Sequence, residues 1–168
     1  MSLLLAVKTT LRLALGLVNL GVLFVFLAAA ARAGEQYVDR EGRPVGGHDV
    51  ITYHTEDSPR MAHADITADY NGLTWHFVSE DNRDLFLADP RRYVPAYDGH
   101  CAYAMANGNK VRSDQLAYRA VNGVLYMNFN RNIQERWDRD IPGYLERSEA
   151  NWPDLEDEPA ASPRGWFF

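Results

Sequence analysis

Two segments of the chain share one pattern of apolar and polar positions. In each, two runs rich in β-branched and aromatic residues flank an Asn-Gly pair. The runs are Ile66–Tyr70 and Leu73–Val78 around Asn71-Gly72, and Leu116–Val121 and Val124–Phe129 around Asn122-Gly123. Asn and Gly tolerate the positive φ angles that a two-residue hairpin turn requires. The pattern therefore predicts two β-hairpins.

A helix-start signal follows each predicted hairpin. Ser79 and Asn130 are residue types that cap helix N-termini, and the acidic Glu80 and Asp81 suit a first helical turn. Pro90 is expected to end the first helix or to start a new one. The side chains expected to face the core are Leu85, Phe86 and Ala88 in the first helix and Ile133 and Trp137 in the second.

The rest of the domain is less regular. Pro142-Gly143 is expected to break the second helix, which leaves residues 144–152 as a last short helix or turn. A helix over Gly99–Ala106 is expected to end at Asn107-Gly108, and Asp49–His54 is either a strand or a helix. Together these elements predict an α+β fold, in which the two hairpins form a small antiparallel sheet with helices packed on one face.

The first 33 residues have a different composition from the rest. Lys8 and Arg12 precede the apolar run Leu13–Ala31, and the small residues of Ala31–Ala33 come directly before Gly34. This layout is typical of a cleavable signal peptide over residues 1–33, which predicts a periplasmic or secreted protein. The alternative is an uncleaved membrane anchor, because the 19 residues of the run come close to a bilayer span of about 20.

The chain after residue 33 is acidic and long enough for one domain. It holds 14 basic and 23 acidic side chains, since three of the 17 basic residues lie in the first 33, and its net charge is −9. Nucleic acid and anionic membrane surfaces need positive patches and are poor partners. The expected organisation is an N-terminal arm over 34–44, a domain over 45–155 and an acidic, proline-containing flexible tail over 156–168.

Cys101 is the only cysteine in the chain and the first candidate for chemistry. It has no partner for an internal disulfide, so in an oxidising compartment it is buried, metal-bound, reactive or paired with another chain. Near the N-terminus of a predicted helix its thiol is expected to have a lowered pKa, which suits a soft-metal ligand or a redox group. Simple burial is the alternative, because free cysteine is often buried.

The histidines do not show the spacing of a metal site. The chain has no HxH, HxxxH or CxxC pair, so no local motif indicates zinc or iron. His48 and Asp49 lie in a predicted loop and are candidate ligands. His100 precedes Cys101, although neighbouring residues on a helix point in different directions. No nucleophile elbow, phosphate loop or HExxH motif is present, so nothing here supports an enzyme.

Aromatic, glycine and proline residues over 70–93 follow a recognisable order. They are Tyr70, Gly72, Trp75, Phe77, Val78, Ser79, Asn82, Phe86, Pro90 and Tyr93. Together with "GGHDVITY", "GHCAYA", "LYMNFNRNIQERWDRDIPGY" and "ANWPDL", they resemble the YHS domain family, in an exported bacterial branch. The resemblance extends over about Val45–Leu155.

The resemblance implies metal handling, and copper is the ion usually proposed for the family. YHS domains occur with copper-transporting ATPases and some di-iron hydroxylases. That implication depends on two cysteines in a Phe-Cys-Ser-x-x-Cys pattern, and Val78 and Asn82 replace them here. The exported branch has one cysteine in a Gly-aromatic-Cys-Ala segment, which corresponds to Cys101, and His100 stands where tyrosine is usual.

Three functions agree with these patterns. The first is an exported metal-handling module that binds copper or zinc through Cys101, with His48, Asp49 and His100 as further metal ligands. The second is a thiol-redox protein, whose Cys101 is oxidised and then reduced by a partner protein. The third is a non-enzymatic binding or scaffold domain in which Cys101 is buried.

Overall fold

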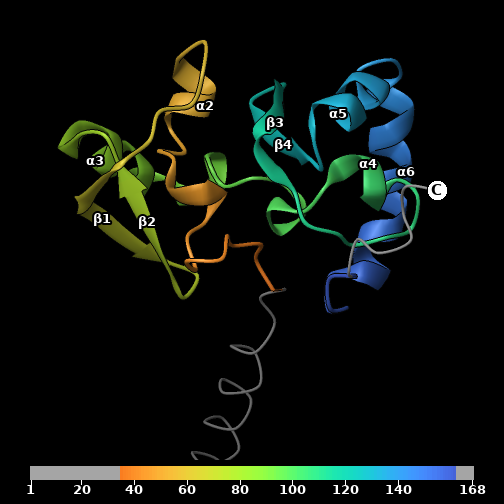
Figure 1. Ribbon diagram of the computed structural model, residues 1–168, viewed down its shortest axis with the longest axis horizontal. Helices are drawn as coiled ribbons and strands as arrows, with labels where there is room; N and C mark the ends of the chain where they lie inside the picture. The colour runs from red at the N-terminus through yellow and green to blue at the C-terminus, as the bar shows by residue number, and fades with distance from the viewer. Residues whose placement is uncertain (1–34, 162–168) are drawn as a thin grey trace, which may run out of the picture. The chain divides into compact units, whose positions relative to one another are not determined.

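The computed structural model describes residues 35–161 (Figure 1). The predicted signal segment over 1–33 and the end of the tail, 162–168, lie outside the described residues. Among residues 35–161, no helix has the length and apolar character needed to cross a membrane. In chain order the elements are η1 (Val45–Gly47), α2 (Thr52–Thr55), β1 (His63–Tyr70), β2 (Leu73–Phe77), α3 (Glu80–Ala88), η2 (Pro90–Arg92), η3 (Tyr97–Gly99), α4 (Ala102–Met105), β3 (Asp114–Val121), β4 (Val124–Asn128), α5 (Arg131–Trp137) and α6 (Ile141–Leu155), where η marks a 3-10 helix.

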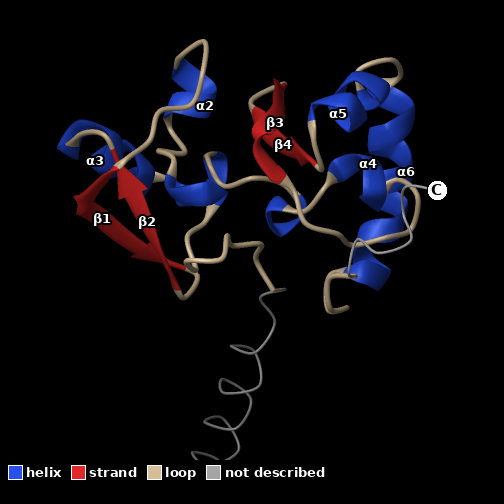
Figure 2. Cartoon of the chain, viewed as in Figure 1, coloured by secondary structure: helices blue, strands red, loops and turns tan. Residues whose placement is uncertain are grey.

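Both predicted hairpins are confirmed, as is the α+β class (Figure 2). The turn residues have positive φ angles, 51° and 73° at Asn71-Gly72 and 52° and 81° at Asn122-Gly123. The hairpins form two separate two-stranded sheets instead of one joined sheet. A physical reason lies at β4, where Ala96 N–H donates to Leu125 O at 2.9 Å and Cys101 bridges to Met127. The segment before α4 therefore contacts β4 where a further strand would pair.

The first hairpin packs against α3 through aromatic side chains. Phe86 of α3 is buried, and its ring centroid lies 5.3 Å from that of Trp75 and 5.2 Å from that of Phe77. The prediction that Leu85 and Ala88 also face the core is wrong, because Leu85 is 49% exposed and Ala88 is exposed. With Phe86 directed into the aromatic cluster, its neighbour Leu85 points about 100° away around the helix.

The second hairpin packs against α4 and α5, and α6 contacts α4. Asn130 Oδ1 caps α5 by accepting Ile133 N–H at 2.9 Å, and Ile133 and Trp137 are buried as predicted. The break after the second predicted helix lies earlier than expected: α5 ends at Trp137, and α6 begins at Ile141 and continues over 15 residues, which include the predicted last helix at 144–152. Pro142 lies in the first helical turn, where its missing N–H removes no helical hydrogen bond.

The arm and the first part of the tail are hydrogen-bonded to the domain. In the arm, Tyr37 N–H donates to Asp98 O at 2.8 Å. Beyond α6, Lys110 Nζ donates to Glu156 O at 2.8 Å, and Ala161 N–H donates to Lys110 O at 2.7 Å. Within the segment predicted to be a flexible tail, at least Glu156 and Ala161 are therefore attached to the loop that precedes β3.

Candidate functional site

Cys101 lies at the junction of α4 and β4. The helix predicted over Gly99–Ala106 is shorter in the structure, so Cys101 is the N-cap of α4. Its Sγ accepts Ala104 N–H at 3.4 Å and lies 3.9 Å from Asn128 Oδ1, toward which the S–H can donate. Asn128 Oδ1 also accepts Tyr103 N–H at 3.3 Å. The thiol is 0% exposed and is held by α4 and β4 together.

The expected lowering of the Cys101 pKa is wrong. Burial raises the pKa of the thiol to about 11, although the N–H groups of Ala104, Phe129 and Tyr103 favour the thiolate. The buried apolar side chains around Cys101 include Val111 and Ile133. Removal of water therefore disfavours the charged sulfur more than the backbone donors of the four-residue α4 favour it.

His100 is buried. It precedes Cys101 in the sequence, but its ring contacts other groups than the thiol does. Its Nε2 lies 2.9 Å from Glu35 O and its Nδ1 lies 3.2 Å from Val111 O. Burial lowers the pKa of His100, and this effect exceeds the opposing effect of the two carbonyl groups. Both ring nitrogens thus face backbone oxygens, and the ring attaches the arm to the loop that contains Val111.

Asp49 is fully buried, and both oxygens of its carboxylate accept hydrogen bonds. Oδ1 accepts Ile51 N–H at 2.9 Å, while Oδ2 accepts Val78 N–H at 2.8 Å and the Asn82 side-chain N–H at 2.7 Å. Val78 and Asn82 are the positions at which the YHS pattern has cysteines. In this chain they contact Asp49 and join the turn before α2 to the start of α3.

His48 also has its own partners. Its Nδ1 lies 3.1 Å from Val45 O, and its ring makes an edge contact with Tyr53 at a centroid distance of 6.4 Å. His48 is half-buried. Its side chain supports the short η1 helix.

The four predicted ligands do not fit a metal ion in this arrangement. Among residues 35–161, no group of three or more His, Cys, Asp and Glu side chains is placed to hold an ion. The carboxylate of Asp49 already accepts three N–H groups, and burial raises the pKa of the Cys101 thiol, which disfavours the thiolate that a metal ion requires. Binding of copper or zinc through His48, Asp49, His100 and Cys101 stays a prediction.

Asn128 is a site residue that the sequence analysis missed. It is fully buried in β4, and its Nδ2 has no hydrogen-bond partner among the described residues. The available signal was a single amide within the apolar run Val124–Phe129. The apolar run predicts only a strand, whereas the contact between Asn128 and Cys101 depends on tertiary packing.

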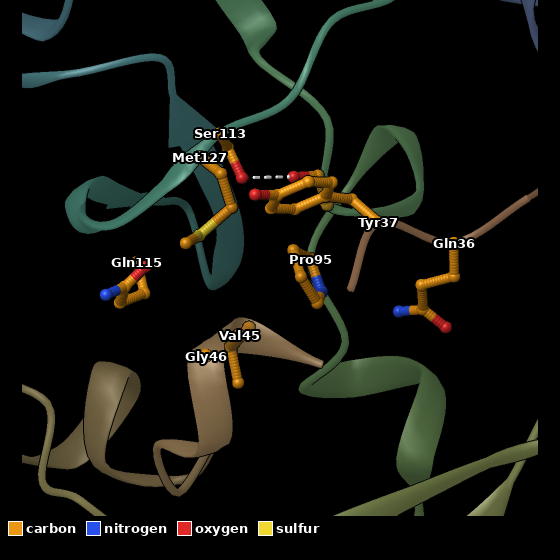
Figure 3. A pocket seen from close by; sticks show the side chains of 9 residues that line it. Gln36, Tyr37, Val45, Gly46, Pro95, Ser113, Gln115 and Met127 are labelled. Carbon is orange, nitrogen blue, oxygen red and sulfur yellow. Dashed lines mark hydrogen bonds between the residues drawn. The ribbon is translucent and has the colours of Figure 1, made fainter. Parts of the chain in front are cut away.

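A small cavity lies between the arm and β4 (Figure 3). Its volume is about 10 Å³, enough for about one water molecule. Tyr37, Pro95 and Met127 line it, and Ser113 Oγ donates to Gly99 O at 2.6 Å along its wall, as the dashed line in Figure 3 shows. This cavity has no room for an organic substrate.

Comparisons with protein-family models, curated proteins and solved structures found no match to this chain. The YHS resemblance therefore stays a prediction from the residues quoted above.

Proposed function

We propose that this protein is a non-enzymatic binding domain in which Cys101 has a structural role. The observation that carries the proposal is the closed environment of the thiol, which is 0% exposed. Burial also raises its pKa to about 11. At neutral pH the sulfur is therefore neither a thiolate nucleophile nor a preformed metal ligand.

The contacts of Cys101 support a structural role. Its sulfur caps the first turn of α4 through Ala104 N–H, and its own N–H donates to Val111 O at 3.1 Å. Asn128 connects the thiol and Tyr103 N–H to β4. The cysteine thus links α4, the loop before β3 and β4, which together form much of the second half of the domain.

The rate of thiol alkylation tests this proposal. We expect iodoacetamide to modify the native protein at pH 7 at least about 100-fold more slowly than the guanidinium-unfolded protein. The reason is that the thiolate fraction falls about tenfold for each unit by which the pKa rises, and burial adds steric protection. Cys101→Ala supplies the background rate. Native alkylation at the unfolded rate would overturn the proposal and favour the thiol-redox function.

Metal titration separates the proposal from the metal-handling alternative. Under reducing conditions, the native protein is expected to bind neither Cu(I) nor Zn(II) stoichiometrically, as measured by elemental analysis after titration. The matched variant is Cys101→Ser. One equivalent of metal in the native protein that is lost in Cys101→Ser would establish metal handling and refute a purely structural Cys101.

We also propose that the domain acts outside the cytoplasm, on the basis of the basic, apolar and Ala-x-Ala pattern over residues 1–33. Cell fractionation of the full chain and of a form that lacks residues 1–33 tests this. Equal cytoplasmic retention of both forms would contradict export.

A further inference from the structure

A groove of about 300 Å³ lies away from Cys101, between the loop after α2 and the elements β3 and α5. Its volume is at the lower limit of the range typical of small-molecule sites. The α2, β3 and α5 labels in Figure 1 mark the elements concerned. The lining residues that bear on ligand binding are Tyr53, Asp57, Leu116, Tyr118, Arg119 and Arg131.

Aromatic and apolar side chains are among the residues that line this groove. The rings of Tyr53 and Tyr118 make an edge contact at a centroid distance of 4.8 Å. Tyr53 OH donates to Gln115 O at 2.9 Å, and Tyr118 OH donates to Asp57 O at 3.3 Å, so both rings are held in place. Leu116 is 50% exposed beside them. An apolar ligand group placed here would cover the Leu116 side chain.

A positioned guanidinium lies on one wall. The buried Gln134 donates from Nε2 to Tyr118 O at 2.7 Å, which directs its Oε1 toward Arg131. Arg131 Nη1 donates to that Oε1 at 3.1 Å. Among residues 35–161, Arg131 has no ion-pair partner. Its remaining N–H groups can receive a carboxylate, for which the planar guanidinium is well suited.

Acidic side chains lie on the loop that lines the groove. Asp57 is exposed, and within the described part of the chain its carboxylate has no ion-pair partner. Glu56 pairs with the exposed Arg60 at 3.4 Å. The other basic residue of the groove, Arg119, is paired with Asp138 at 2.7 Å. The free charges are therefore one cation, Arg131, and one anion, Asp57.

We infer that this groove, with a volume of about 300 Å³, binds a small zwitterion that carries an apolar or aromatic side chain. Its carboxylate pairs with Arg131, its ammonium group pairs with Asp57, and its side chain packs on Leu116 and Tyr118. The inference rests on the proposed binding function and names the ligand class. A molecule with a single charge satisfies only one of the two unpaired groups.

Titration of the full-length protein with the dipeptide Gly-Phe tests the inference. Calorimetry measures the affinity, and NMR chemical-shift changes show whether the groove residues are affected. We expect N-acetyl-Gly-Phe and Gly-Phe-amide, which each lack one charge, to bind about two- to fivefold more weakly. Both side chains are exposed to water, so each ion pair is expected to change the affinity only a few-fold. No binding of Gly-Phe, or equal binding of all three ligands, would overturn the inference.

Two pairs of variants locate the site. Arg131→Gln and Asp57→Asn are each expected to weaken Gly-Phe binding about two- to fivefold. Their controls are Arg136→Gln on α5 and Asp65→Asn on β1, which do not line the groove and are expected to bind as the native protein does. Unchanged affinity in Arg131→Gln would refute the assigned carboxylate contact. Because the alkylation of Cys101 does not depend on this groove, failure of Gly-Phe binding leaves the structural role of Cys101 standing.

Discussion

At the scale of single residues, the buried carboxylate of Asp49 connects two parts of the fold that lie far apart in the sequence. It accepts N–H groups from Ile51, Val78 and Asn82, which belong to the turn before α2 and to the β2–α3 junction. A buried charge that is surrounded by donors in this way is stabilising only while every donor remains paired. Asp49 is therefore more sensitive to substitution than an exposed acid.

Asp49→Asn is expected to lower the free energy of unfolding by about 2–4 kcal/mol. The amide removes the charge and places an NH₂ group against N–H donors, and a hydrogen bond to a charged group contributes about 1.5–3 kcal/mol. Urea denaturation measures the change. The exposed Asp65→Asn is the control, with an expected change within about 0.5 kcal/mol. Equal stability of the two variants would show that the Asp49 contacts do not stabilise the fold.

At the scale of elements, the two hairpin turns depend on backbone conformation more than on packing. Gly123 has a φ angle of 81°, and a Cβ added there would meet no atom within 4 Å. Asn122, the other turn residue, has a φ angle of 52°. The positive φ angles bring β3 and β4 into register, with Val121 opposite Val124.

Gly123→Ala is expected to destabilise the protein by about 1–2 kcal/mol, because an L-residue is strained in the left-handed region. Because a Cβ at this position meets no other atom within 4 Å, steric overlap does not add to the destabilisation. In Asn122→Gly the new residue also adopts positive φ readily, so we expect the free energy of unfolding to change by no more than about 0.5 kcal/mol. Thermal unfolding of both variants checks the pair. A Gly123→Ala protein as stable as Asn122→Gly would contradict this explanation.

At the scale of the whole molecule, two histidines attach segments that are distant in the sequence. His54 Nε2 lies 3.2 Å from Tyr93 O, and His100 Nε2 lies 2.9 Å from Glu35 O. Burial lowers the pKa of both histidines, and the neighbouring carbonyl groups only partly oppose this. The folded protein therefore favours the neutral form of both rings.

This arrangement predicts that stability decreases as the pH falls below about 6.5, the pKa of an unperturbed histidine. In that range the unfolded state binds more protons than the folded state, so the contribution present at pH 7 is lost as the pH falls through the lowered pKa values. Urea denaturation at pH 7 and pH 5 measures the difference. The double variant His54→Gln/His100→Gln is expected to show a smaller difference, whereas the exposed His63→Gln keeps it. An unchanged difference in the double variant would exclude these two rings as its source.

Local chemistry determined much of the fold from the sequence. The Asn-Gly pairs predicted both hairpins because positive φ is a property of those residues, and Asn130 predicted the start of α5 because capping needs only its own first turn. The direction of Leu85 could not be predicted in this way. It depends on which side of α3 the aromatic cluster occupies, and that is a property of the packed first hairpin.

The chemistry of the site depended on contacts between distant residues. From the sequence, Cys101 is a lone thiol near a helix start, and that position alone favours a lowered pKa. Its actual environment is formed by Asn128, the last residue of β4, by Phe129, which follows it, and by Val111. Asn128 and Phe129 lie 27 and 28 positions after Cys101 in the sequence. The sequence by itself determined the two hairpin turns and the starts of α3 and α5, because the preferences of Asn-Gly, Ser79 and Asn130 are local. Only the tertiary structure decided that Cys101 is buried and protonated and that Arg131 faces a groove, because desolvation and side-chain direction depend on packing between distant segments.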